Sequence, residues 1–241
     1  MARKRQRLRV LEHELARRHP ELQDPRAAIL RGDVLVDGIA RTNPASLLRP
    51  GASITLRRPR RLRGGEKLAF ALQAFEIDAR GRTALDVGAG AGGFTSALLE
   101  AGARRVYAVD AGHGQLLGSL RLDPRVVNLE ATNVSTLDRR LVPEPVDIVA
   151  VDLSYLALRD AAPQLAPVAF GRSVDAIALV KPQFELKRAS VPTARQDLAG
   201  AAVSAADGFA SAGWQIAEVI ESPIRGAGGA IELFLHARRA G

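Results

Sequence analysis

One stretch of the chain decides its fold: Leu85-Asp86-Val87-Gly88-Ala89-Gly90-Ala91-Gly92-Gly93-Phe94-Thr95. Apolar residues precede the glycines as in a buried strand, and Ser96-Ala97-Leu98-Leu99 follows with the character of a helix. Because glycine has no Cβ, glycines between a strand and a helix permit positive φ angles and the close approach of a ligand to the backbone. The stretch predicts a turn that binds a nucleoside cofactor.

The acids around this turn favour one cofactor over another. Gly88, Gly90 and Gly93 alone match the G-x-G-x-x-G pattern of dinucleotide sites, which would fit NAD as well. Asp86 would repel a pyrophosphate but would attract the sulfonium and ammonium groups of S-adenosylmethionine. Asp110 ends the next apolar run, where an acid holds ribose hydroxyls in Rossmann-like sites. The predicted residues for binding S-adenosylmethionine are Asp86, Gly88, Gly90, Gly92, Gly93, Phe94, Asp110, Asn133 and Asp152.

Seven short apolar runs alternate with helical stretches from residue 84 onward. Continuous apolar strands between helices indicate a parallel sheet that is covered on both faces. The prediction is therefore an α/β fold with a Rossmann-like, seven-stranded sheet. The expected strands are 84–87, 106–109, 126–129, 148–151, 176–180, 216–220 and 231–235.

Positive charge is concentrated at the beginning of the chain. Residues 1–63 carry 16 Lys and Arg against 6 Asp and Glu, whereas residues 64–241 carry 18 against 20. The basic segment also has the pattern of short helices and strands, which predicts a small α+β domain that binds a polyanion. The expected boundaries are this domain at 1–58, a basic linker at 59–64 and the cofactor-binding domain at 65–241. The candidate RNA-binding residues are Arg3, Lys4, Arg5, Arg7, Arg31, Arg57, Arg58, Arg60, Arg61 and Arg63.

The composition excludes several kinds of site. The chain has no cysteine, which removes disulfides, zinc–thiolate sites and cysteine nucleophiles and fits a reducing cytoplasm. Its four histidines are scattered without the spacing of metal ligands. No apolar run approaches the roughly 18 residues that a membrane span needs, and the N-terminus lacks the apolar region of a signal peptide. We expect a cytoplasmic protein with neither a metal site nor a membrane segment.

Several motifs together resemble one known family. Besides the glycine turn, they include Tyr107-Ala108-Val109-Asp110, Gly114-Gln115-Leu116 and Val180-Lys181-Pro182-Gln183-Phe184-Glu185. On these motifs nearly the whole chain resembles the TlyA family, whose members are also labelled hemolysins. The resemblance implies an S-adenosylmethionine-dependent methyltransferase for a ribose 2′-hydroxyl of ribosomal RNA, at a cytidine. It also implies an S4-like RNA-binding domain followed by an FtsJ-like catalytic domain, with ribosomal RNA or a ribosomal subunit as partner.

The resemblance implies a catalytic tetrad of Lys67, Asp152, Lys181 and Glu232. Composition supports the two lysines independently, because the chain has 30 Arg and only four Lys. A lysine can lose its proton in a crowded site, whereas an arginine cannot. We expect Lys181 to orient and deprotonate the ribose hydroxyl. Asp152 and Glu232 are expected to hold Lys181, with Lys67 tuning the local charge.

Three other functions stay open at this level. The chain could be a non-catalytic RNA- or ribosome-binding protein, a membrane-active hemolysin or a small-molecule methyltransferase. The intact tetrad argues against the first, the lack of an apolar segment against the second, and the basic beginning of the chain against the third. Residues 186–194 depart most from the family pattern. The sequence leaves open the modified nucleotide, the ribosomal subunit and the oligomeric state.

Overall fold

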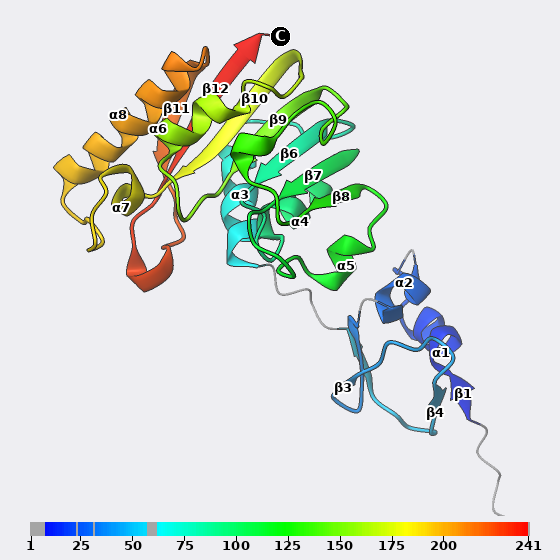
Figure 1. Ribbon diagram of the computed structural model, residues 1–241. Helices are drawn as coiled ribbons and strands as arrows, with labels where there is room; N and C mark the ends of the chain where they lie inside the picture. The colour runs from blue at the N-terminus through cyan, green and yellow to red at the C-terminus, as the bar shows by residue number, and fades with distance from the viewer. Residues whose placement is uncertain (1–7, 23, 31, 57–61, 241) are drawn as a thin grey trace, which may run out of the picture. The chain divides into compact units, whose positions relative to one another are not determined.

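The computed structural model describes residues 8–22, 24–30, 32–56 and 62–240. The chain divides into two compact units, Met1–Arg60 and Arg61–Gly241, which are described separately below (Figure 1). Helix α3 begins at Arg63, inside the segment predicted as linker. The helix starts this early because Gly64 and Gly65 pack against Gly93 of a neighbouring helix instead of lying in an extended connection.

The N-terminal unit is a small α+β fold. Two helices are separated near His19-Pro20, and their apolar sides pack on short antiparallel strands around Leu11, Leu15 and Ile29. A two-residue turn at Asp37-Gly38, with both φ angles positive, closes a β-hairpin. The elements are β1 (Arg9–Val10), α1 (Leu11–Arg18), α2 (Pro25–Leu30), β2 (Val34–Val36), β3 (Ile39–Ala40), β4 (Leu47–Leu48) and β5 (Ile54–Leu56).

The second unit contains the predicted seven-stranded sheet. Its order is β11-β12-β10-β9-β6-β7-β8. The five strands from β8 to β10 pair in parallel, and β12 runs antiparallel to both of its neighbours. The strands are β6 (Thr83–Val87), β7 (Arg105–Val109), β8 (Val126–Leu129), β9 (Val146–Val151), β10 (Phe170–Val180), β11 (Gln215–Glu221) and β12 (Leu233–Ala240).

Strand β8 alone keeps its expected boundaries, and β10 and β12 depart furthest from theirs. Strand β10 begins at Phe170 instead of residue 176, because its early residues pair with the far end of β12. Strand β12 begins at Leu233 instead of residue 231. Glu232 therefore lies just before the strand, at the edge of the sheet where the parallel strands end.

Helices cover both faces of the sheet and give it two cores (Figure 1). On one face, α3 and α4 pack through Leu68, Phe94 and Leu98. On the other face, α6 and α8 pack through Leu158 and Phe209, and Trp214 is buried there. The helices of this unit are α3 (Arg63–Ala74), α4 (Gly93–Glu100), α5 (Gly118–Arg121), α6 (Leu158–Ala161), α7 (Pro182–Glu185) and α8 (Arg195–Ser211), with 3-10 turns η1 (Val134–Thr136), η2 (Ala162–Leu165) and η3 (Ala227–Gly229).

Candidate active site

The glycine turn joins β6 to α4, and side chains at several of its glycine positions would clash with neighbouring atoms. Gly88, Gly90 and Gly92 have φ angles of +91°, +50° and +93°. A Cβ on Gly88 would lie 2.2 Å from the carbonyl oxygen of Asp152. The turn can therefore pass the end of β9 only if residue 88 is glycine. A Cβ on Gly92 would lie 2.2 Å from the side chain of Leu120. The conformation therefore requires the glycines that the sequence pattern singled out.

A second glycine contact brings the beginnings of two helices together. A Cβ on Gly65 of α3 would lie 2.9 Å from the carbonyl oxygen of Gly93, the first residue of α4. A Cβ on Gly93 would in turn meet the backbone nitrogen of Gly65 at 2.9 Å. The close packing of α3 on α4 places Lys67, two residues further along α3, beneath the same edge of the sheet.

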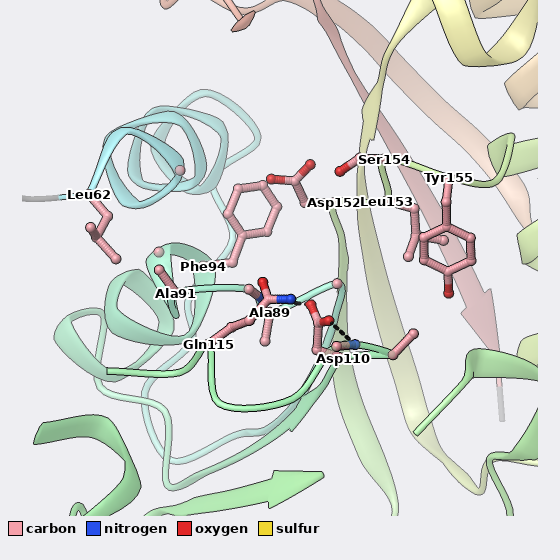
Figure 2. Close-up of a pocket in the computed structure, with 16 residues that line it drawn as sticks. Leu62, Ala89, Ala91, Phe94, Asp110, Gln115, Asp152, Leu153, Ser154 and Tyr155 are labelled. Atoms are coloured by element: carbon pink, nitrogen blue, oxygen red, sulfur yellow. Dashed lines mark hydrogen bonds between the residues drawn. The ribbon is translucent and has the colours of Figure 1, made fainter. Parts of the chain in front are cut away.

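Asp110 follows β7 and braces the glycine turn. The backbone N–H of Gly90 donates to one carboxylate oxygen at 2.8 Å, and the backbone N–H of Gly112 donates to the other at 2.7 Å (Figure 2). The carboxylate thus ties the turn after β6 to the loop after β7. An ionised carboxylate offers about four acceptor positions, so both oxygens keep capacity for further donors.

A cavity of about 450 Å³ opens above these loops. The glycine turn, Asp110 and the segment after β9 form its walls, with the ring of Phe94 on one side (Figure 2). Its volume lies in the range that holds cofactors. Of the residues predicted for the cofactor, the cavity is lined by Gly88, Gly90, Gly93, Phe94, Asp110 and Asp152.

The other three predicted cofactor residues do not line the cavity. Gly92 faces Leu120, as described above. Asn133 is exposed and caps η1, since its side-chain oxygen accepts from the backbone N–H of Ser135 at 3.0 Å. Asp86 is fully buried within β6 behind the turn. Their expected contacts with a cofactor remain predictions.

Asp86 is an unusual carboxyl group. The hydroxyl of Thr95 donates to its Oδ2 at 2.6 Å, whereas its Oδ1 is buried without a hydrogen-bond partner among the described residues. Burial raises the pKa of Asp86 to about 7, and the negative charges of Asp152 and Asp110 act in the same direction. The group therefore exchanges its proton near neutral pH.

The four tetrad residues form two ion pairs. The Nζ of Lys181, which follows β10, lies 2.5 Å from the Oδ1 of Asp152, which follows β9. Lys67 donates to the carboxylate of Glu232, and both side chains are buried. The first pair agrees with the sequence expectation. The second corrects it, because the carboxylate of Glu232 pairs with Lys67 and not with Lys181; its place before β12 directs it toward α3.

Residues 60–239 match the FtsJ-like methyltransferases. The chain belongs to the FtsJ-like methyltransferase family. This confirms the resemblance noted above, and it assigns the seven-stranded unit to an enzyme family whose members transfer methyl groups.

Individual relatives of this FtsJ-like chain carry two kinds of name. The 16S/23S rRNA (cytidine-2′-O)-methyltransferase TlyA of Mycobacterium tuberculosis is 39% identical over 239 residues, which cover 95% of this chain and 89% of that protein. Hemolysin A of Brachyspira hyodysenteriae is 33% identical over 219 residues, 86% of this chain and 90% of that protein. A solved Streptococcus thermophilus structure named as a hemolysin has a TM-score of 0.71 and 27% identity, covering 97% of this chain and 89% of that one.

Sequence reasoning missed part of the cavity of this FtsJ-like unit. The loop after β7 contributes Gln115, and the segment after β9 contributes Leu153, Ser154 and Tyr155 (Figure 2). Tyr155 is 53% exposed at the edge, and partial desolvation together with the negative charge of Asp110 raises its pKa. Gln115 lies within the Gly114-Gln115-Leu116 motif, and the position of the other three just after a parallel strand was a signal that could have marked them.

Most of the predicted RNA-binding residues lie outside the part of the chain that the structure describes. The exception is Arg63 at the beginning of α3, whose guanidinium donates to the carbonyl oxygen of Gly226 at 3.5 Å. The others are Arg3, Lys4, Arg5, Arg7, Arg31, Arg57, Arg58, Arg60 and Arg61.

Within residues 8–22, 24–30, 32–56 and 62–240, no group of three or more His, Asp or Glu side chains is arranged to hold a metal ion. Within the same ranges, no helix combines the length and apolar character of a membrane span.

Proposed function

We propose that this chain transfers a methyl group from S-adenosylmethionine to a ribose 2′-hydroxyl of ribosomal RNA, at a cytidine. The observation that carries the proposal is the Lys181–Asp152 pair, whose carboxylate lines the cavity beside the glycine turn of an FtsJ-like methyltransferase. The substrate class follows from the M. tuberculosis relative, which is named for ribosomal RNA cytidine 2′-O-methylation.

The cavity fits S-adenosylmethionine by its chemistry. The glycine turn leaves room for an adenosyl group against the backbone, and Asp110 keeps acceptor positions for the ribose hydroxyls. Asp152 carries negative charge at the cavity wall, which favours a cationic sulfonium or ammonium group. The cofactor supplies an electrophilic methyl carbon when bound. Asp86 lies behind this wall, where its negative charge would favour the cationic cofactor.

The two ion pairs divide the catalytic work. In its neutral amine form, Lys181 binds the 2′-hydroxyl and takes its proton as that oxygen attacks the methyl group that bound S-adenosylmethionine would supply. Asp152 holds the resulting ammonium group at 2.5 Å. Lys67 and Glu232 form a buried ion pair below the site, and this pair fixes α3 against the beginning of β12. Neither of these two side chains needs to touch the reacting atoms.

The N-terminal unit is proposed to be the S4-like RNA-binding domain. The net positive charge of the chain lies in residues 1–63, and a polyanion is the partner that such a charge attracts. Structured RNA would be held through its phosphates and 2′-hydroxyls, without extensive reading of sequence. An RNA substrate of this kind places the enzyme in the cytoplasm, as the lack of cysteine also suggests.

The decisive experiment is transfer of labelled methyl groups to purified ribosomal subunits, followed by mapping of the modified nucleotide. Wild-type protein should modify a cytidine ribose, and Lys181→Ala should lower the rate by about a hundredfold or more. Arg80→Gln is the matched control, because it also removes one positive charge but sits in an exposed pair with Asp78 before β6. It should leave the rate unchanged.

Two results would refute the proposal. Absence of methyl transfer to any ribosomal subunit or ribosomal RNA would exclude the substrate class. Near-wild-type transfer by Lys181→Ala at saturating cofactor would exclude the role of Lys181. Calorimetry with S-adenosylmethionine separates a catalyst from a protein that only binds RNA, since the latter has no need of the cofactor.

A further inference from the structure

A buried carboxylate organises three arginines on the N-terminal unit. Glu14 of α1 is only 4% exposed, although it is surrounded by charged side chains on the surface of a small fold. Its Oε1 accepts from Arg17 at 2.6 Å and Arg18 at 2.8 Å, and its Oε2 accepts from Arg9 at 2.8 Å and again from Arg17 at 3.1 Å. Hydrogen bonds from Arg17, Arg9 and Arg18 hold the pKa of Glu14 well below its ordinary value.

The three guanidinium groups keep most of their donors free of contacts within the described chain. Each guanidinium has five N–H donors. Glu14 uses some of these, and the carbonyl oxygen of Ala52 takes one more from Arg18 at 3.0 Å. Among the described residues, the remaining N–H groups of Arg9, Arg17 and Arg18 have no other hydrogen-bond acceptor.

The cluster also carries excess charge and borders a hollow. One carboxylate faces three guanidinium groups, so the cluster remains positive, and Arg9 and Arg17 are 60% and 61% exposed. A surface cavity of about 360 Å³ lies against it, and Arg49 from the turn after β4 lines the same cavity. Planar guanidinium forks match phosphate oxygens in pairs, which makes such a cavity suited to a phosphodiester.

We propose that Glu14 is a positioning residue of a phosphate site for the RNA backbone, formed by Arg9, Arg17, Arg18 and Arg49. The inference rests on the proposed function, since it assigns residues to the RNA-binding role of the N-terminal unit. Its distinctive claim is that a negative charge strengthens the binding of a polyanion. Long arginine side chains lose rotamer freedom when they bind, and prior fixation by Glu14 lowers that entropic cost.

The test is the affinity of the full-length protein for a fluorescently labelled ribosomal RNA transcript, measured by anisotropy across a salt series. Glu14→Gln should weaken binding about five- to tenfold, although it removes a negative charge. Glu12→Gln is the matched control on the same helix, because Glu12 pairs with Arg26 and contacts none of the three arginines. It should leave the affinity unchanged or raise it slightly, as charge alone predicts.

A second pair of variants covers the case in which Glu14→Gln fails to fold. Arg17→Gln and Arg26→Gln remove the same charge from similarly exposed side chains, 61% and 64%. Arg17→Gln should weaken binding about five- to tenfold and Arg26→Gln less than about twofold. In a folded Arg17→Gln background, the further effect of Glu14→Gln should shrink, which a merely structural role of Glu14 would not produce.

The outcomes separate this inference from the proposed function. If Glu14→Gln binds the transcript as tightly as wild type or more tightly, or if Arg17→Gln and Arg26→Gln weaken it equally, the positioning role is refuted while RNA methylation stands. If wild-type protein neither binds ribosomal RNA nor methylates it, the proposed function fails first. Capture of an acidic protein in place of RNA would likewise overturn the assignment of the site to a phosphodiester.

Discussion

The ammonium group of Lys67 and the carboxylate of Glu232 form a buried ion pair across 165 positions of sequence. Their side chains are 7% and 6% exposed. Either charge alone in this position would lack compensation, because transfer of an unpaired ion from water into a protein interior is strongly unfavourable. The pair therefore couples the position of α3 to the beginning of β12, on the side of the sheet where Asp152 and Lys181 meet.

Replacement of one member of this pair should destabilise the fold more than replacement of both members. Lys67→Met leaves the carboxylate of Glu232 buried and unpaired, at a cost of about 3–5 kcal/mol in the free energy of unfolding. The double variant Lys67→Met/Glu232→Leu should recover most of that loss. Denaturant unfolding measures both values. A single variant that loses less than about 1 kcal/mol would show that the pair does not hold the fold together.

Gly88 should tolerate no side chain. Gly88→Ala would place a Cβ 2.2 Å from the carbonyl oxygen of Asp152 at a φ of +91°, so the turn must move and S-adenosylmethionine should no longer bind detectably in calorimetry. Gly118→Ala is the control, since nothing lies within 4 Å of its added Cβ at the beginning of α5. The control should bind normally and gain about 0.5 kcal/mol of stability. Normal cofactor binding by Gly88→Ala would contradict the assigned turn.

Substitutions of Asp110 should weaken the binding of the cofactor, and the loss of affinity should depend on the residue introduced. Asp110→Ala leaves the backbone N–H groups of Gly90 and Gly112 without their acceptor, and hydrogen bonds to a charged group contribute about 1.5–3 kcal/mol each. Asp110→Asn keeps one acceptor oxygen, so its loss of affinity should be smaller. We expect at least a tenfold rise in the dissociation constant for Ala, as about 1.4 kcal/mol gives. Equal affinities in the three proteins would rule out the bracing role.

Asp86 should make the stability depend on pH between about 4 and 7. Its pKa is raised from 3.8 to about 7 in the folded protein, so the unfolded chain releases this proton first as pH rises. The folded state is therefore favoured by this group at low pH and loses that advantage as pH rises toward 7. Asp86→Asn removes this titration. Its free energy of unfolding should exceed that of the wild type by about 2 kcal/mol at pH 8, with little difference near pH 4.

The readout for Asp86→Asn is the free energy of unfolding at several pH values, without cofactor. A gain that is the same at pH 4 and pH 8 would mean that titration of this carboxyl group is not its source. Cofactor affinity measured on the same variant tests the separate prediction that the charge of Asp86 assists binding. A stabler protein with weaker binding is the expected combination, because functional sites retain groups that cost stability.

The arginines around Glu14 show what a count of charges along the sequence does not reveal. The sequence located the excess positive charge in residues 1–63, yet the predicted binding residues were those in segments 3–7 and 57–63, together with Arg31. The ordered cluster on Glu14 instead draws Arg17 and Arg18 from one helix and Arg9 from the strand before it. A glutamate among arginines counts against a basic patch in the sequence, whereas in the structure its burial makes it the acceptor that they share.

The sequence by itself determined the local features of this protein. Glycine spacing from Gly88 to Gly93 determined the turn, because only glycine adopts those φ angles at that density. Continuous apolar runs determined the seven strands of the sheet, and Asp152 and Lys181 could be assigned to one edge because parallel strands end together. These inferences depend on short segments and on a topology that recurs.

Only the tertiary structure decided which side chains meet. The pairing of Glu232 with Lys67, the two amides bound by Asp110 and the burial of Asp86 all join segments that lie in different elements. Such contacts depend on the packing of helices on the sheet and on where β12 begins, to within one or two residues. Sequence periodicity does not define boundaries that finely, and a shift of one residue turns a side chain to the other face of a strand.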